Sequence, residues 1–139
     1  MSFKWKDRYN LNISEIDKQH RKLFEIGARA YDLVMLDDSF DHYDEIIGIF
    51  NELLEYTEYH FDYEEKLMEA YKYDGYGHQK QEHAFFINKI KEMTSRDIDS
   101  NQQKAVLDVI DFLSEWIGSH ILLSDRKYAA SFEEKGIKI

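Results

Sequence analysis

Apolar residues recur along most of the chain at alternating steps of three and four, which places them on one face of an α-helix. This pattern predicts four amphipathic helices, over about residues 17–36, 41–71, 77–93 and 100–129. Nothing alternates at the two-residue period of a half-buried strand, so no sheet is predicted. Long amphipathic helices with short connections favour an all-α fold, an antiparallel up-down-up-down four-helix bundle.

The first 16 residues predict an N-terminal arm that lies against the bundle. Their apolar side chains are too many for a solvated tail: Phe3, Trp5, Tyr9, Leu11, Ile13 and Ile16. The chain has no proline and only six glycines, so little interrupts the helices. Ser100 and Gln103 have capping-box spacing at the start of the last helix. We find no repeat or linker, and residues 1–139 are expected to form a single domain.

Charge and composition exclude several classes of function. Acidic residues exceed basic ones by 28 to 18, and the net charge of −10 repels phosphate backbones and anionic lipid. We therefore expect no nucleic acid and no membrane as partner. No stretch approaches the roughly 20 apolar residues of a membrane span, and the first residues lack the apolar core of a signal peptide. A cytoplasmic protein is expected. Because cysteine is absent, any metal must be bound through nitrogen and oxygen.

Each predicted helix carries one histidine on its apolar face: His20, His60, His83 and His120. In an antiparallel bundle, the early parts of the first and third helices lie level with the late parts of the second and fourth. The four histidines then fall in one layer at one end of the bundle. A single buried histidine is usually an ordinary core residue. Four of them beside carboxylates would be costly to desolvate without a metal.

Two carboxylates join this layer. Glu64 lies one helical turn after His60, a spacing at which both side chains can bind one metal ion. Asp125 lies five residues after His120, about 140° around an α-helix, so we expect it to reach inward from a neighbouring position or toward a second metal. Two carboxylates and several imidazoles are too many for one tetrahedral zinc, and they favour a carboxylate-bridged dinuclear site. The expected walls are apolar: Phe24, Phe61, Trp116 and Ile121.

Four segments resemble, in order, the motifs of the hemerythrin and bacteriohemerythrin family. They are ISEIDKQH at 13–20, HFDYEEKLM at 60–68, KQEHAFF at 80–86 and WIGSHILLSDRKY at 116–128. The resemblance implies a non-haem di-iron centre, two Fe ions that cycle between Fe2+ and Fe3+ with an oxo or hydroxo bridge. It also implies reversible binding of dioxygen as hydroperoxide, for storage, delivery or sensing.

The resemblance implies roles for six matched residues: His20 and His60 at the iron with a position open for dioxygen, His83 and His120 at the other iron, and Glu64 and Asp125 as bridges. Oxygen binding needs no side-chain acid or base, so we expect a binding protein rather than an enzyme. The alternative is a di-iron redox enzyme that consumes dioxygen or peroxide at the same site. A redox partner protein is a candidate partner.

One position departs from the family pattern, which has a histidine four residues before His83. Here that position is Gln79, and the neighbouring His78 lies about 100° away around the helix. Three readings stay open: Gln79 ligates iron through its amide oxygen, the second iron keeps an open or water-filled position, or a π-bulge brings His78 inward. We favour Gln79 in the slot and include it among the candidate metal-site residues. One hypothesis is that the loss of an imidazole makes the second iron more Lewis-acidic and favours autoxidation or peroxide chemistry over reversible oxygen binding.

Overall fold

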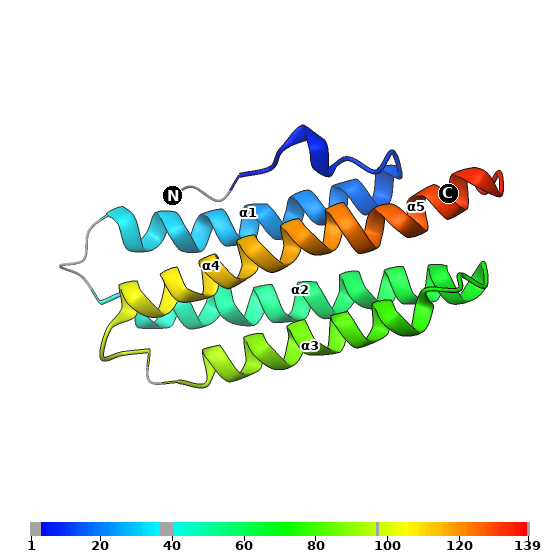
Figure 1. Ribbon diagram of the computed structural model, residues 1–139. Helices are drawn as coiled ribbons and strands as arrows, with labels where there is room; N and C mark the ends of the chain where they lie inside the picture. The colour runs from blue at the N-terminus through cyan, green and yellow to red at the C-terminus, as the bar shows by residue number, and fades with distance from the viewer. Residues whose placement is uncertain (1–3, 37–40, 97, 139) are drawn as a thin grey trace.

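The structure, a computed structural model, describes residues 4–36, 41–96 and 98–138. Within these ranges it contains helices and no strand (Figure 1). The elements in chain order are η1 (Asp7–Tyr9), α1 (Ser14–Leu36), α2 (Tyr43–Ala70), α3 (Tyr76–Thr94), α4 (Gln102–Ser119), η2 (His120–Asp125) and α5 (Arg126–Glu134). Helices α1 and α3 each pack against α2 and α4, which confirms the predicted four-helix bundle. In the described ranges, no helix has both the length and the apolarity that crossing a membrane requires.

Helix α4, the π-helical turn η2 and α5 follow one another as a single rod (Figure 1). The sequence pattern predicts that the last helix ends at about residue 129, whereas the structure continues the helix to Glu134. The reason is Phe132, which is buried with its ring 5.5 Å from Tyr128 and 5.6 Å from Tyr71. Burial of this aromatic ring stabilises one more helical turn than propensity alone would.

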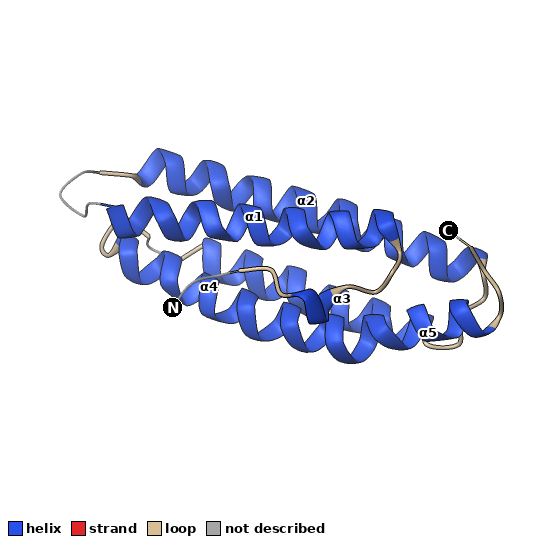
Figure 2. Ribbon diagram, turned by 90° about the horizontal axis from the view of Figure 1, so that it is seen from above, coloured by secondary structure: helices blue, strands red, loops and turns tan. Residues whose placement is uncertain are grey.

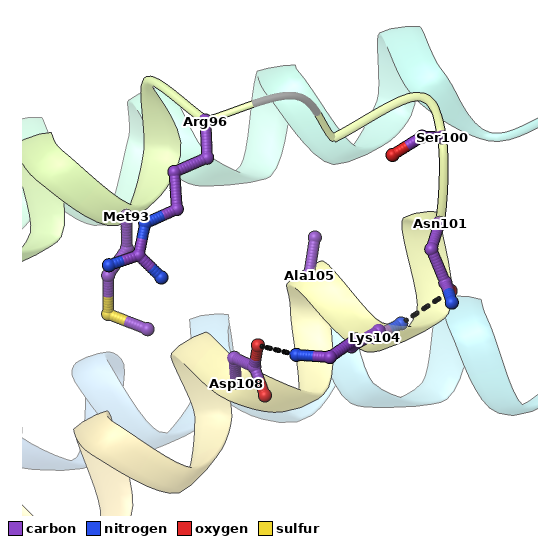
Figure 3. A pocket seen from close by; sticks show the side chains of 7 residues that line it. All are labelled: Met93, Arg96, Ser100, Asn101, Lys104, Ala105 and Asp108. Atoms are coloured by element: carbon purple, nitrogen blue, oxygen red, sulfur yellow. Dashed lines mark hydrogen bonds and ion pairs between the residues drawn. The ribbon is translucent and has the colours of Figure 1, made fainter.

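The start of α4 is capped differently from the prediction. Asn101, not Ser100, is the N-cap, and its Oδ1 accepts a hydrogen bond from the Lys104 backbone N–H at 3.0 Å (Figure 3). The Lys104 ammonium also lies 2.7 Å from Asp108 one turn further on. Beside this cap, a pocket of ≈ 170 Å³ lies between the end of α3 and α4. No histidine lines it, and we read this end of the bundle as structural.

The core is built from the apolar faces that the sequence pattern predicts. Among the most deeply buried side chains are Ile16, Leu23, Ile26, Ile46, Phe86, Ile90, Ile110 and Leu113. Each such side chain contributes about 1.5–3 kcal/mol when it leaves water. This burial holds the four helices rigidly enough to fix the polar side chains that are enclosed with them.

The N-terminal arm is tied to the bundle by Asp17 in the first turn of α1. Its carboxylate accepts hydrogen bonds from the backbone N–H of Leu11 at 2.8 Å and of Asn12 at 3.1 Å. The ring of Tyr9 lies 5.2 Å from that of Phe24, so the arm also packs against α1. Figure 2 shows the arm, with η1, running back along the bundle from the start of α1.

We predict that Asp17→Ala releases the arm and lowers the free energy of unfolding by about 1–3 kcal/mol, because the buried backbone N–H of Leu11 and the partly buried one of Asn12 lose their acceptor. Urea unfolding followed by circular dichroism measures the change. Asp44→Ala is the matched control, since Asp44 is an exposed aspartate in the first turn of α2. Equal stability of the two variants would contradict this role of Asp17.

Candidate metal centre

The four helical segments bring all the sequence-predicted side chains into one buried cluster. Helix α1 contributes His20, α2 contributes His60 and Glu64, α3 contributes Gln79 and His83, and η2 contributes His120 and Asp125. Two groups of donor atoms within this cluster are close enough to hold a metal ion each: Glu64, His83, His120 and Asp125, and His20, His60 and Glu64. Glu64 belongs to both groups, so the cluster is arranged for two neighbouring metal positions.

The distances within the cluster connect the two groups. On α2, His60 Nε2 lies 2.9 Å from Glu64 Oε1. The two oxygens of Asp125 face different histidines: Oδ2 lies 3.2 Å from His20 Nε2, and Oδ1 lies 3.0 Å from His120 Nε2. Asp125 is therefore placed, like Glu64, between the two positions.

A π-helical turn brings Asp125 to the same face as His120. In a regular α-helix, five residues would separate the two side chains by about 140°. The structure instead winds His120–Asp125 as a π-helix, whose wider turn pairs residues five apart. The prediction that Asp125 and His120 lie on different faces of the helix is therefore wrong, whereas Asp125 does reach inward, toward both groups of donors. The five-residue spacing between two candidate ligands was the available signal, and only the backbone resolves it.

Three of the histidines direct Nδ1 at a polar side chain outside the cluster, and we identify none of these partners from the sequence. The pairs are His60 with Gln19 Oε1 at 2.7 Å, His83 with Glu65 Oε2 at 2.8 Å, and His120 with Glu82 Oε2 at 3.0 Å. A carboxylate only accepts hydrogen bonds, so Nδ1 of His83 and His120 must carry the proton. In the neutral rings, Nε2 then presents a lone pair to the cluster.

This donor set fits metal ions. Nε2 of His83 and Nε2 of His120 are 3.2 Å apart, and two facing lone pairs repel unless a proton or a metal ion lies between them. Among the described residues, several buried atoms make no hydrogen bond of acceptable geometry, although two of the close pairs above include them: His20 Nε2, Glu64 Oε1, Gln79 Oε1 and Asp125 Oδ2. Buried polar atoms without partners are rare and costly. Cations bound by the two groups would supply partners to the histidine and carboxylate atoms among them.

Burial shifts the ionisation of Glu64 and His60 in the protein alone. Burial, followed by the nearby charge of Asp125, raises the pKa of the Glu64 carboxyl to about 7. Burial lowers the pKa of His60 to about 4, so its imidazole is neutral at physiological pH. Near neutral pH, Glu64 is therefore partly protonated and a cation would displace this proton, while His60 is already in its ligating form.

In contrast to Glu64 and His60, for which burial favours the neutral form, His120 and Asp125 form a charged pair. Although burial opposes it, the charge and hydrogen bond of Asp125, with the hydrogen bond of Glu82, raise the pKa of His120 to about 10. Burial also works against ionisation of Asp125, but His120 and then His20 hold its pKa well below the usual range. A proton on His120 therefore supplies, in the protein alone, the positive charge that the cluster needs.

Aromatic rings enclose one side of the cluster. Phe61 stacks on His83 with ring centroids 3.9 Å apart, and Trp116 stacks on His120 at 4.4 Å. Ile121, which follows His120 in η2, is also buried. Phe24, in contrast, packs against Trp5 of the arm at 5.6 Å. Tyr128, which is fully buried, donates its hydroxyl hydrogen to Glu64 Oε2.

The neighbours Gln79 and His78 point in different directions. Helix α3 is α-helical through both residues, so the π-bulge that would bring His78 inward is wrong. The His78 side chain is 72% exposed, and its Nε2 lies 2.6 Å from Glu82 Oε1. Gln79 is buried and donates its amide N–H to Asp125 Oδ1 at 3.0 Å.

Comparison with known proteins assigns the family. The hemerythrin HHE cation-binding domain matches residues 11–131. The chain belongs to the hemerythrin family. It is 41% identical over 126 residues to a bacteriohemerythrin of Clostridium acetobutylicum, an alignment that covers 91% of this chain and 98% of that relative. A bacteriohemerythrin of Pseudomonas aeruginosa is 31% identical, over 89% of this chain and 77% of its own. The myohemerythrin of Sipunculus nudus is 25% identical, over 89% and 88%.

Membership of the hemerythrin family confirms the resemblance carried by the four motifs. The matched region runs from the end of the arm into α5 and includes every residue of the buried cluster. The cofactor of this family is a di-iron centre, and two adjacent groups of nitrogen and oxygen donors suit a pair of irons better than one tetrahedral ion.

We predict that metal binding releases protons from Glu64 and His120. A ligating carboxylate and imidazole must be deprotonated, and the pKa values of about 7 and about 10 mean that protons must leave near neutral pH. The affinity for Zn2+ should therefore tighten by at least about tenfold for each unit of pH between 6 and 8. Titration in weakly buffered solution with an indicator dye counts the protons. An affinity that is constant across this range would contradict the prediction.

Proposed function

We propose that six residues of the cluster hold two irons and that the protein binds dioxygen reversibly at this centre, for storage, delivery or sensing. The ligands are His20 and His60 at one iron, His83 and His120 at the other, and Glu64 and Asp125 between them. The observation that carries the proposal is the pair of buried donor groups that share Glu64. When bound, the two irons supply the electrons that reversible binding of dioxygen needs.

The chain's own residues set the spacing and the environment of this centre. Glu64 and Asp125 each face donors of both groups, so they fix how far apart the two positions are. The hydroxyl of Tyr128 holds one oxygen of Glu64 and thereby orients this carboxylate. The stacked rings of Phe61 and Trp116 exclude water from the side of His83 and His120. A dry wall slows the loss of a charged form of oxygen to solvent.

Gln79 takes the position of the histidine that the family pattern has, and we propose that its amide oxygen serves the second iron. The N–H side of the amide must face the Asp125 carboxylate, because two oxygens would repel there. The Oε1 atom is then the free end, and it is buried without a hydrogen-bond partner among the described residues. A neutral oxygen donor in place of an imidazole is a weaker ligand for Fe2+.

The proposal also covers the setting of the centre. We infer a single domain over residues 1–139, supported by the match over 11–131. The net charge of −10 supports the absence of nucleic acid and membrane partners. A composition without cysteine suits a reducing compartment such as the cytoplasm. A redox partner protein would return an oxidised centre to the ferrous state.

The direct test is an iron count combined with visible spectra of the reduced protein before and after exposure to air. We expect two irons per chain, and an absorption band that appears with dioxygen and disappears when dioxygen is removed. A preparation without iron would overturn the di-iron proposal. Two irons whose oxidation by air is rapid and irreversible would overturn oxygen binding and favour the redox enzyme.

Substitution of one ligand tests the assignment of residues. We predict that His60→Ala lowers the iron content below two per chain and abolishes the reversible band, because one group of donors loses a neutral imidazole. His42→Ala is the control: His42 precedes α2, and its ring nitrogen contacts Glu45 rather than the cluster. Iron content and spectra that agree between the two variants would remove His60 from the site.

Substitutions of Gln79 separate ligation from plain packing. We predict that Gln79→Leu, which keeps the size but removes the amide, loses one of two metal ions to a chelator faster than the original protein. Gln79→His should retain both, since imidazole is the stronger donor. Metal analysis during dialysis against the chelator measures this. Equal retention in the leucine variant and the original protein would leave Gln79 with a packing role only.

A further inference from the structure

The histidines of the two metal positions differ in the hydrogen-bond partner of their Nδ1 atoms. His83 and His120 both have a carboxylate at Nδ1, from Glu65 and Glu82. At the other position, His60 has only the neutral amide of Gln19 at Nδ1. Nδ1 of His20 is buried and has no hydrogen-bond partner among the residues that the structure describes. One half of the centre is thus supported by two anions, and the other half by none.

This difference changes how strongly each imidazole binds a metal ion. A carboxylate that accepts the Nδ1 hydrogen polarises the ring and makes Nε2 a better donor, and it also fixes the orientation of the ring. An amide oxygen fixes the orientation without adding negative charge. His83 and His120 are therefore the stronger pair of donors, and the two nearby anions add to the attraction for a cation.

Glu82 is held in place by contacts of its own, and Glu65 lies in a groove on the surface of the bundle. Glu82 accepts a hydrogen bond from Ser124 Oγ at 2.6 Å, and His78 Nε2 lies at the same distance from it. Glu65 follows the bridging Glu64 directly on α2 and lies in the groove between α2 and α3, whose lining includes His83 and Phe61. Both are only partly exposed, at 25% for the Glu82 side chain and 20% for that of Glu65. Solvent screens such charges only in part.

We propose that Glu65 and Glu82 are positioning residues that make the half with His83 and His120 the higher-affinity metal position, so that the two metal ions bind in order. This inference rests on the proposed two-metal centre and deepens it. It also accounts for Gln79, the neutral donor in the same half. The carboxylates of Glu65 and Glu82 offset the weaker donor strength of Gln79. The position with His83 and His120 therefore still binds the first metal ion, although Gln79 replaces the third histidine of the family pattern there.

The experiment is a titration of the metal-free full chain with Co2+, in competition with a chelator and followed by visible absorption. The original protein should bind two Co2+ in two separate steps. Glu82→Gln and Glu65→Gln keep an oxygen that can accept from Nδ1, as Gln19 does for His60, but remove the charge. Each should weaken the tighter step by roughly 10- to 100-fold and leave the weaker step unchanged.

A spectroscopic signal reports on the histidines directly. With one Co2+ bound, the exchangeable Nδ1–H signals of the ligating rings are shifted by the paramagnetic ion. They should belong to His83 and His120, and Glu82→Gln should move the signal of His120. Loss of helix or packing would not produce this selective change. Shifted signals from His20 and His60 at one equivalent would reverse the proposed order and overturn the inference.

The converse change provides the matched control. The double substitution Glu15→Gln and Gln19→Glu exchanges a carboxylate and an amide that are already hydrogen-bonded at 3.0 Å, and it puts the charge behind His60. It leaves the net charge of the chain unaltered. The affinity of the weaker Co2+ binding step should increase and that of the tighter step should stay unchanged. The two dissociation constants should therefore move closer together.

The outcomes separate this inference from the proposal on which it rests. If the original protein binds no Co2+ or only one, the two-metal centre itself fails. If it binds two, while both glutamine variants remain helical by circular dichroism with unchanged steps, only the inference is overturned. Should either single variant fail to fold, the other variant and the double substitution still decide.

Discussion

The cost of burying charge governs this structure. Glu64 and Asp125 have no exposed surface, and four imidazoles lie beside them in the core. Isolated ions at such a depth would cost more than a bundle of this size can supply. In the protein alone, protons reduce this cost. Near neutral pH, Glu64 is partly protonated, with a pKa of about 7, and His120 is protonated, with a pKa of about 10. Two metal ions would take over the same role, so stability and function draw on the same groups.

The backbone departs from regular geometry where this cluster requires it. A π-helical turn has poorer hydrogen bonding than an α-helix and tends to occur at functional sites. Here it lies at His120–Asp125, between two α-helical segments of the same rod. This turn directs the side chains of His120 and Asp125 into the buried cluster. It also sets the phase of α5, so that Tyr128 reaches Glu64.

The sequence predicts the bundle and the layer of histidines because both follow from helical periodicity and antiparallel order. Family membership and the all-helical fold are confirmed. The π-helical turn is not predictable in the same way, since a spacing of five fits no regular helix. The sequence also does not predict the hydrogen-bond partners of the histidine Nδ1 atoms, which are Gln19, Glu65 and Glu82. Each is a polar residue adjacent to a predicted ligand, and such a residue looks like part of a solvated helix face until the neighbouring helix is placed.

In helix α3, the direction of a side chain, more than its residue type, decides whether it lies in the buried cluster. A search for histidines alone would choose His78 as the missing ligand, yet its side chain is 72% exposed. Gln79, one residue later, is the side chain enclosed in the cluster. His78 is still connected to the cluster, because it contacts Glu82, which in turn contacts His120. Two adjacent residues of α3 thus contact the cluster in different ways: Gln79 directly, through Asp125, and His78 through the carboxylate of Glu82.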